Sequence, residues 1–226
     1  MGWLTSLGTA AADLTLGRCC AGCDRPGVHL CPECRDELEP HVRFHTRVHL
    51  DEVAPGVGLP VFASLQYTGV RRHVLYRFKD HGDFSMTPFL VSALRAVLDE
   101  VTTHTDVSPR VAVPIPSRRA AHARRGFSPT VHLLQRALPR TRPRLRIASL
   151  LVDERTGRGD KGLGGADRRA SVAGAFRLRG HGSGDPVILV DDIVTTGATM
   201  REAALTLMHA GVHVVAGAAV AGTQLG

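Results

Sequence analysis

VILVDDIVTTGAT, residues 187–199, is the stretch that decides the fold class of this 226-residue chain. Its first four residues are an uninterrupted run of β-forming apolar side chains, as in a parallel strand that helices cover on both faces. Residues 199–210 then place apolar side chains at helical spacing, and Gly211 is suited to end that helix. A further apolar strand is predicted over residues 212–220. This order of strand, helix and strand predicts an α/β fold with a mostly parallel sheet.

The segments before it continue the alternation. Residues 61–67 and 111–115 read as strands. Thr87-Pro88 and Ser128-Pro129 each supply a helix cap with a first-turn proline, and apolar residues at helical spacing follow both pairs. The mixed basic and apolar residues after Thr68-Gly69 give no clear structural prediction.

A Pro- and Gly-rich stretch suggests how the chain is divided. Pro55, Gly56, Gly58 and Pro60 are typical of a linker, so we place a boundary there. The predicted parts are an N-terminal segment, residues 1–50, and a larger domain, residues 60–226.

The residues after the central strand have the composition of a phosphate cup. Gly197 permits close backbone approach, and the N–H groups at the start of the next helix favour an anion. Hydroxyl donors come from Thr195, Thr196 and Thr199. The adjacent acids Asp191 and Asp192 repel each other unless hydroxyl donors or a cation satisfy them, which a ribose diol with Mg²⁺ would do. A helix cap followed by an ordinary turn is the simpler interpretation, but motif and context together favour a ligand site.

All five cysteines fall between Cys19 and Cys34. Cys20-Ala-Gly-Cys23 and Cys31-Pro-Glu-Cys34 are two CxxC knuckles, and four thiolates select zinc in a closed, structural site. Free core thiols and a redox pair are the alternatives, but the spacing favours zinc. Cys19 is a rival to Cys20 as a ligand, although its use breaks the CxxC spacing.

Composition limits the partners. Lys and Arg outnumber Asp and Glu by 28 to 21, so a positive surface should attract phosphate-bearing ligands or nucleic acid. The N-terminal residues have neither the pattern of a secretory signal nor a long uncharged run, so we expect a cytoplasmic protein with no membrane partner. Aromatic residues make up only 4% of the chain, which argues against an extensive base-stacking platform.

VILVDDIVTTGAT resembles the signature with which type I phosphoribosyltransferases bind 5-phosphoribosyl 1-pyrophosphate (PRPP). Three further stretches, LQYTGVRRHVLYRFKDHGD, VPIPSRRAAHARRGFSPT and RRASVAGAF, accompany the N-terminal cysteine cluster. Together they resemble the ComF family of competence-associated phosphoribosyltransferase-like proteins, over residues 18–221.

The resemblance implies a type I phosphoribosyltransferase-like fold: a mostly parallel sheet flanked by helices, a variable hood and a small N-terminal zinc-binding module with four cysteine ligands. It implies that Asp191 and Asp192 are catalytic and hold the ribose hydroxyls. Residues 116–119 match the pyrophosphate loop, in which Arg118 and Arg119 have suitable chemistry. The residues that would hold the 5-phosphate are Thr195, Thr196, Gly197, Ala198 and Thr199.

The implied function is transfer of a phosphoribosyl group from PRPP to a nitrogen acceptor with release of pyrophosphate, in which Mg²⁺ and Arg stabilise the departing charge. An alternative is a non-catalytic sensor of PRPP or a nucleotide that binds single-stranded DNA or a helicase partner during DNA uptake or recombination. Salvage of a free nucleobase is a third. In the Gly-rich residues 153–175, the side chains of Arg155, Arg158 and Lys161 either close over pyrophosphate as a lid or are simply solvated. The acceptor and the oligomeric state do not follow from the sequence.

Overall fold

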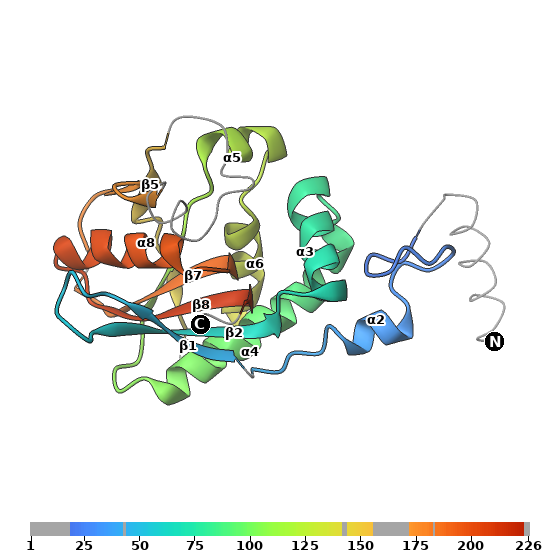
Figure 1. The fold of residues 1–226 in the computed structure, drawn as a ribbon, viewed down its shortest axis with the longest axis horizontal. Coiled ribbons are helices and arrows are strands. Elements are labelled where there is room, and N and C mark those ends of the chain that lie inside the picture. Colours follow the sequence, from blue (N-terminus) through green and yellow to red (C-terminus); the bar gives the residue numbers. More distant parts are fainter. Residues whose placement is uncertain (1–18, 43, 142–143, 156–171, 183, 224–226) are drawn as a thin grey trace.

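The computed structural model describes residues 19–42, 44–141, 144–155, 172–182 and 184–223. These residues form a six-stranded sheet with helices on both faces and a separate two-stranded sheet (Figure 1). The α-helices are α2 (Pro32–Asp36), α3 (Gly69–His81), α4 (Thr87–His104), α5 (Arg119–Arg125), α6 (Pro129–Ala137) and α8 (Ala198–His209). Short 3-10 helices are η1 (Phe84–Met86) and η2 (Leu138–Arg140). The strands are β1 (Phe44–His49), β2 (Gly58–Gln66), β3 (Val111–Pro114), β4 (Arg146–Ile147), β5 (Leu151–Asp153), β6 (Phe176–Leu178), β7 (Val187–Val194) and β8 (Val214–Gly222).

The large sheet has the order β1-β2-β8-β7-β3-β4, in which every neighbouring pair is parallel except β1 with β2. This confirms the α/β fold with a mostly parallel sheet. The central strand is longer than its apolar run, because β7 continues to Val194 and stays paired with β8. Asp191 and Asp192 therefore lie within the strand, and the turn to α8 begins only at Thr195.

The expected linker is part of a hairpin. The register of β1 against β2 pairs Phe44 with Ala63 and His49 with Gly58, and Leu50 N–H donates to the Val57 carbonyl at 2.8 Å. Residues 44–49 thus belong to the large sheet, and the Pro- and Gly-rich stretch is the turn between two of its strands. The division into residues 1–50 and 60–226 stays a prediction, with the end of the first segment joined to the second by this pairing.

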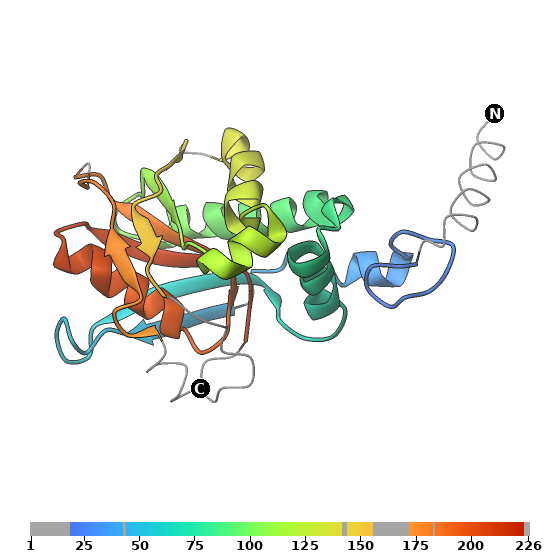
Figure 2. The same cartoon turned by 90° about the horizontal axis from the view of Figure 1, so that it is seen from above.

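Each face of the sheet has its own hydrophobic core, as alternation along β7 requires. Ile188 and Val190 pack with α3, α4 and α6, whereas Val187 and Leu189 pack with α8 and the β5–β6 pair. Figure 2 shows α8 and this small sheet together on one side of the large sheet. A Cβ atom at Gly217 of β8 would lie 2.9 Å from Met200 Sδ, so α8 approaches the sheet closely at this point.

Helix α3 accounts for the stretch that gave no clear prediction. It buries Val74, Leu75 and Phe78, and Gly82 ends it in the left-handed conformation with a φ of 66°. The cysteine-containing segment lies at one end of the molecule, beyond α3 (Figure 1). It packs on that helix, because a Cβ atom at Gly22 would come within 2.7 Å of Val70. Within the described ranges, no helix has both the length and the apolar character needed to span a membrane.

Candidate functional site

A cavity of about 500 Å³ opens where β2, β3 and β7 end. The carboxyl ends of parallel strands are where open α/β sheets place their ligands. Three connections supply its walls: Tyr67 after β2, residues 115–118 after β3 and residues 195–197 after β7. Of the residues predicted to form the ligand site, the cavity brings together Arg118, Asp191, Asp192, Thr195, Thr196, Gly197, Ala198 and Thr199.

The turn after β7 is shaped to present backbone N–H groups. Gly197 precedes α8 in the left-handed conformation, with a φ of 72°. The turn is anchored by Thr223, whose hydroxyl donates to the Thr195 carbonyl at 3.0 Å and whose N–H donates to the Val194 carbonyl at 2.9 Å. The first turn of a 12-residue helix therefore lines the cavity, where its N–H groups and dipole favour an anion.

The two acids of β7 have different environments. Alternation along the strand directs Asp192 to the face covered by α3, where Lys79 Nζ lies 2.8 Å from its Oδ1 and 2.7 Å from its Oδ2. The Asp192 side chain is only 5% exposed, and that of Lys79 is 26% exposed. Burial alone would lower the pKa of Lys79, but Asp192 and then Asp191 raise it above its ordinary value. Asp192 is therefore neutralised by Lys79 of the same chain. The sequence had suggested that a ligand or a metal ion would supply this positive charge.

Asp191 is the less satisfied acid. Its Oδ1 accepts the backbone N–H of Asp192 at 2.8 Å, and its side chain lines the cavity. Loss of hydration raises the pKa of Asp191 well above its usual range, and the charge of Asp192 adds to this while Lys79 opposes it. Hydroxyl donors or a divalent cation entering the cavity would compensate this carboxylate.

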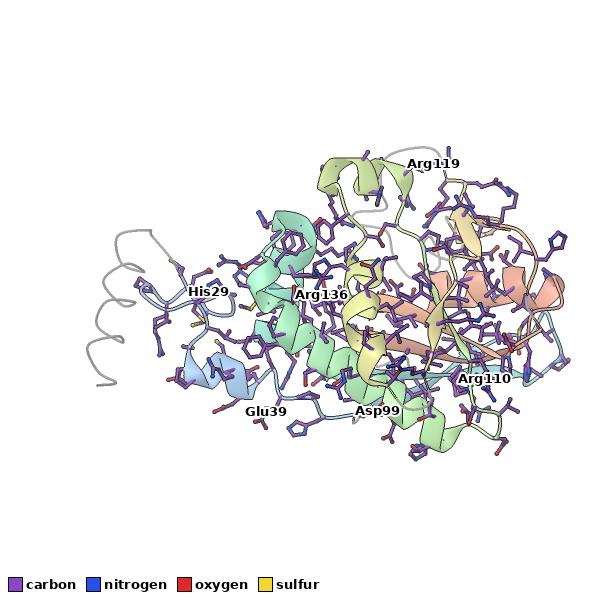
Figure 3. All side chains as sticks on the ribbon, turned by 180° about the vertical axis from the view of Figure 1, so that it is seen from behind. His29, Glu39, Asp99, Arg110, Arg119 and Arg136 are labelled. Carbon is purple, nitrogen blue, oxygen red and sulfur yellow. The ribbon has the colours of Figure 1, made fainter. Side chains whose placement is uncertain are left out.

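The basic residues divide between two pockets. Arg118 lines the cavity, together with Arg72, Lys79, Arg125 and Arg155. Arg119 does not; as the first residue of α5 it lines a neighbouring pocket on the other side of residues 115–117, and Figure 3 shows it at the periphery of the molecule. The structure thus places Arg118 in the cavity and Arg119 outside it, because α5 starts between them and separates their side chains. That these arginines contact pyrophosphate stays a prediction.

Of the three basic residues predicted to act in the Gly-rich stretch, the structure describes only Arg155. Arg155 lines the cavity and donates from Nε to both carboxylate oxygens of Asp153, at 3.0 and 3.2 Å. Its guanidinium also lies 5.4 Å from the centre of the Phe176 ring. Arg158 and Lys161 lie outside the described residues.

The four predicted metal ligands converge. The Sγ atoms of Cys20, Cys23, Cys31 and Cys34 all lie within 4.8 Å of one another, and Cys19 is not in the group. Cys23 and Cys31 are 3.8 Å apart, close to the separation of about 3.8 Å that a tetrahedron with zinc–sulfur bonds of about 2.3 Å requires.

The backbone around Cys20 also suits a thiolate. Burial disfavours ionisation of Cys20, but N–H groups of Cys31 and Gly22, at 3.4 and 3.5 Å from its sulfur, help to lower its pKa to about 6. The cluster is thus compatible with structural zinc. Figure 3 places it near His29, at the end of the molecule far from Arg110 and the sheet.

Comparison with known proteins finds similarity to two competence proteins. Competence protein F of Haemophilus influenzae is 30% identical over 144 residues, which are 62% of this chain and 62% of that protein. Competence protein ComFC of Bacillus subtilis is 29% identical over 202 residues, 86% of this chain and 73% of that protein. The chain is similar to the ComF competence proteins. This confirms the ComF resemblance seen in the sequence motifs, although the match spans less than two thirds of the Haemophilus protein. No protein-family model matches the chain.

Among solved structures, adenine phosphoribosyltransferase from Leishmania donovani superposes with a TM-score of 0.35 at 14% identity, covering 65% of this chain and 56% of that chain. The enzyme from Saccharomyces cerevisiae gives a TM-score of 0.35 at 13% identity, covering 85% and 89%. At these scores the overlap is weak, and the fold assignment of the ComF-like chain rests on its own sheet order.

Proposed function

We propose that this chain binds PRPP with Mg²⁺ in the cavity at the strand ends and transfers its phosphoribosyl group to a nitrogen acceptor, releasing pyrophosphate. The observation that carries the proposal is the placement of a helix N-terminus and two adjacent acids at the end of one parallel strand, in a single cavity. Five basic side chains of described residues line the same cavity, which suits a ligand with more than one phosphate group.

In the proposed complex the 5-phosphate lies on the turn Thr195–Thr199, where N–H and hydroxyl donors are available. The ribose hydroxyls donate to Asp191 and Asp192, which relieves the poor hydration of Asp191. Arg118 contacts the pyrophosphate. Carboxylates are hard oxygen ligands of the kind that Mg²⁺ prefers, and bound Mg²⁺ supplies positive charge that stabilises the departing pyrophosphate.

A second candidate is a PRPP or nucleotide sensor that acts without turnover and contacts single-stranded DNA or a helicase. Two observations favour it: the similar proteins carry competence names, and the chain has a net charge of +7. In this version the cavity binds the same ligand, and the zinc cluster holds the N-terminal segment in shape for a partner.

Calorimetric titration of PRPP with Mg²⁺ into the wild type and Asp191→Asn tests the transferase and the sensor proposals. Loss of a charge-assisted hydrogen bond should weaken binding about ten- to a hundredfold. Asp106→Asn is the control, because Asp106 is an exposed acid outside the cavity. Pyrophosphate release on addition of nitrogenous bases supports the transferase, and binding without release supports the sensor. No PRPP binding by the wild type refutes both.

A further inference from the structure

Arg125 is a buried cation to which the proposed function assigns no specific contact. It is the last residue of α5, its side chain is 9% exposed, and it lines the cavity. Its Nη2 donates to Asp80 Oδ1 at 2.9 Å. Its Nε is buried and has no hydrogen-bond partner among the described residues. Burying a charged donor without a partner is costly, so this geometry calls for an acceptor that the described part of the chain does not supply.

Asp80 fixes the direction of the guanidinium. It lies on α3 directly after Lys79, and it also accepts from Arg124 Nη2 at 3.4 Å. Burial would raise the pKa of Asp80, but the hydrogen bond and charge of Arg125 hold it below its ordinary value. Asp80 therefore stays ionised at neutral pH and joins α3 to α5 at the cavity wall. Arg124 shares this partner but is 63% exposed and does not line the cavity.

Two cations that face one cavity repel each other until an anion enters. Lys79 and Arg125 both line the cavity, and the charge of Arg125 opposes the upward shift in the pKa of Lys79. Lys79 is already paired with Asp192 through both carboxylate oxygens. Arg125 differs from Lys79 in that one of its donors, Nε, is buried without an acceptor among the described residues.

We infer that Arg125 binds the diphosphate end of the ligand, and that Asp80 is its positioning residue. The inference rests on the proposed function and adds a residue that selects for the second anionic group. One end of the ligand meets the start of α8, and the other meets the end of α5. A guanidinium presents donors in a planar fork, so it can hold two oxygens of a diphosphate at once.

The test compares three probes: PRPP with Mg²⁺, which carries both anionic groups, ribose 5-phosphate, which carries only the 5-phosphate, and inorganic diphosphate. In Arg125→Gln, affinity for PRPP and for diphosphate should fall about ten- to a hundredfold, whereas that for ribose 5-phosphate should not change. Arg125→Lys keeps the charge but loses the fork, so it should lose less. Asp80→Asn should also weaken PRPP and diphosphate, and the control Arg124→Gln should bind all three probes like the wild type.

Thermal melts identify any variant that fails to fold. If Arg125→Gln does not fold, the conservative variant Arg125→Lys is compared with the wild type instead. Equal PRPP affinity in wild type and both Arg125 variants overturns the inference while leaving PRPP binding intact. An equal loss for ribose 5-phosphate also overturns it, because Arg125 would then act on the whole cavity. If the wild type binds neither PRPP nor ribose 5-phosphate, the proposed function fails. Diphosphate binding that depends on Arg125 would still support the subsite, and its absence would overturn it.

Discussion

Replacing Lys79 by Met removes one charge from the buried pair with Asp192 and keeps the length of the side chain. The carboxylate of Asp192 is then left 5% exposed, beside Asp191 and without its cation. Breaking a buried ion pair from one side costs about 3–5 kcal/mol. Because the Lys79 side chain is 26% exposed and solvent screens the pair in part, we expect about 2–3 kcal/mol. For a chain of this length, that is a fall in Tm of about 4–12 °C.

The stability that Lys79 contributes should depend on pH, and the direction follows from its pKa. The pKa of Lys79 is raised in the folded state, so its contribution is fully present below its ordinary pKa and is lost as the pH rises through the folded value. Lys79→Met lacks this contribution at every pH. Its deficit relative to wild type should therefore be constant up to neutral pH and shrink as the pH rises through the folded pKa of Lys79.

Urea unfolding of wild type and Lys79→Met, at pH 7 and at a pH above the ordinary pKa of lysine, measures both effects. The double variant Lys79→Met with Asp192→Leu removes both charges and should recover most of the lost stability, since an apolar pair of similar volume is often neutral. A single variant within about 0.5 kcal/mol of wild type at pH 7 would refute the reasoning, because that is the range of ordinary surface substitutions.

Three further outcomes are expected. Asp191→Asn should raise the ligand-free stability by about 1 kcal/mol at neutral pH, because an ionised group with a raised folded pKa costs stability; thermal melts that show no gain over wild type would contradict this. Elemental analysis should find about one zinc per chain, and Cys34→Ser should lose it and unfold the N-terminal segment; a variant that retains its zinc would show the ligand set to be wrong. Binding to single-stranded DNA should be weak and should fall steeply with salt in fluorescence titrations, with no binding at low salt as the contrary result.

The features that the sequence could predict are those whose signals are local. The apolar run of β7, the TTGAT turn and the two CxxC knuckles each lie within a few residues, and their spacing carries the geometry. Helix α5 gave no such signal, because it buries no apolar side chain and has no apolar stripe. For the same reason, the start of α5 between Arg118 and Arg119 was not foreseen.

Long-range pairing explains the other misses. Lys79 and Asp192 are 113 positions apart, so nothing near either residue indicates the contact. Pro55 and Gly56 mark a reversal of the chain, but composition does not distinguish the turn of a hairpin from a linker. Only the pairing of β1 with β2 decides between them.

The position of β8 has a consequence for folding. This strand lies between β2 and β7 although it follows both in the chain. In any folding intermediate in which β8 has not yet inserted, β2 and β7 each have an open edge. Open strand edges pair readily with other chains, so such an intermediate is prone to aggregation. Insertion of β8 closes both edges in one step, which couples completion of the ligand cavity to docking of the segment Val214–Gly222.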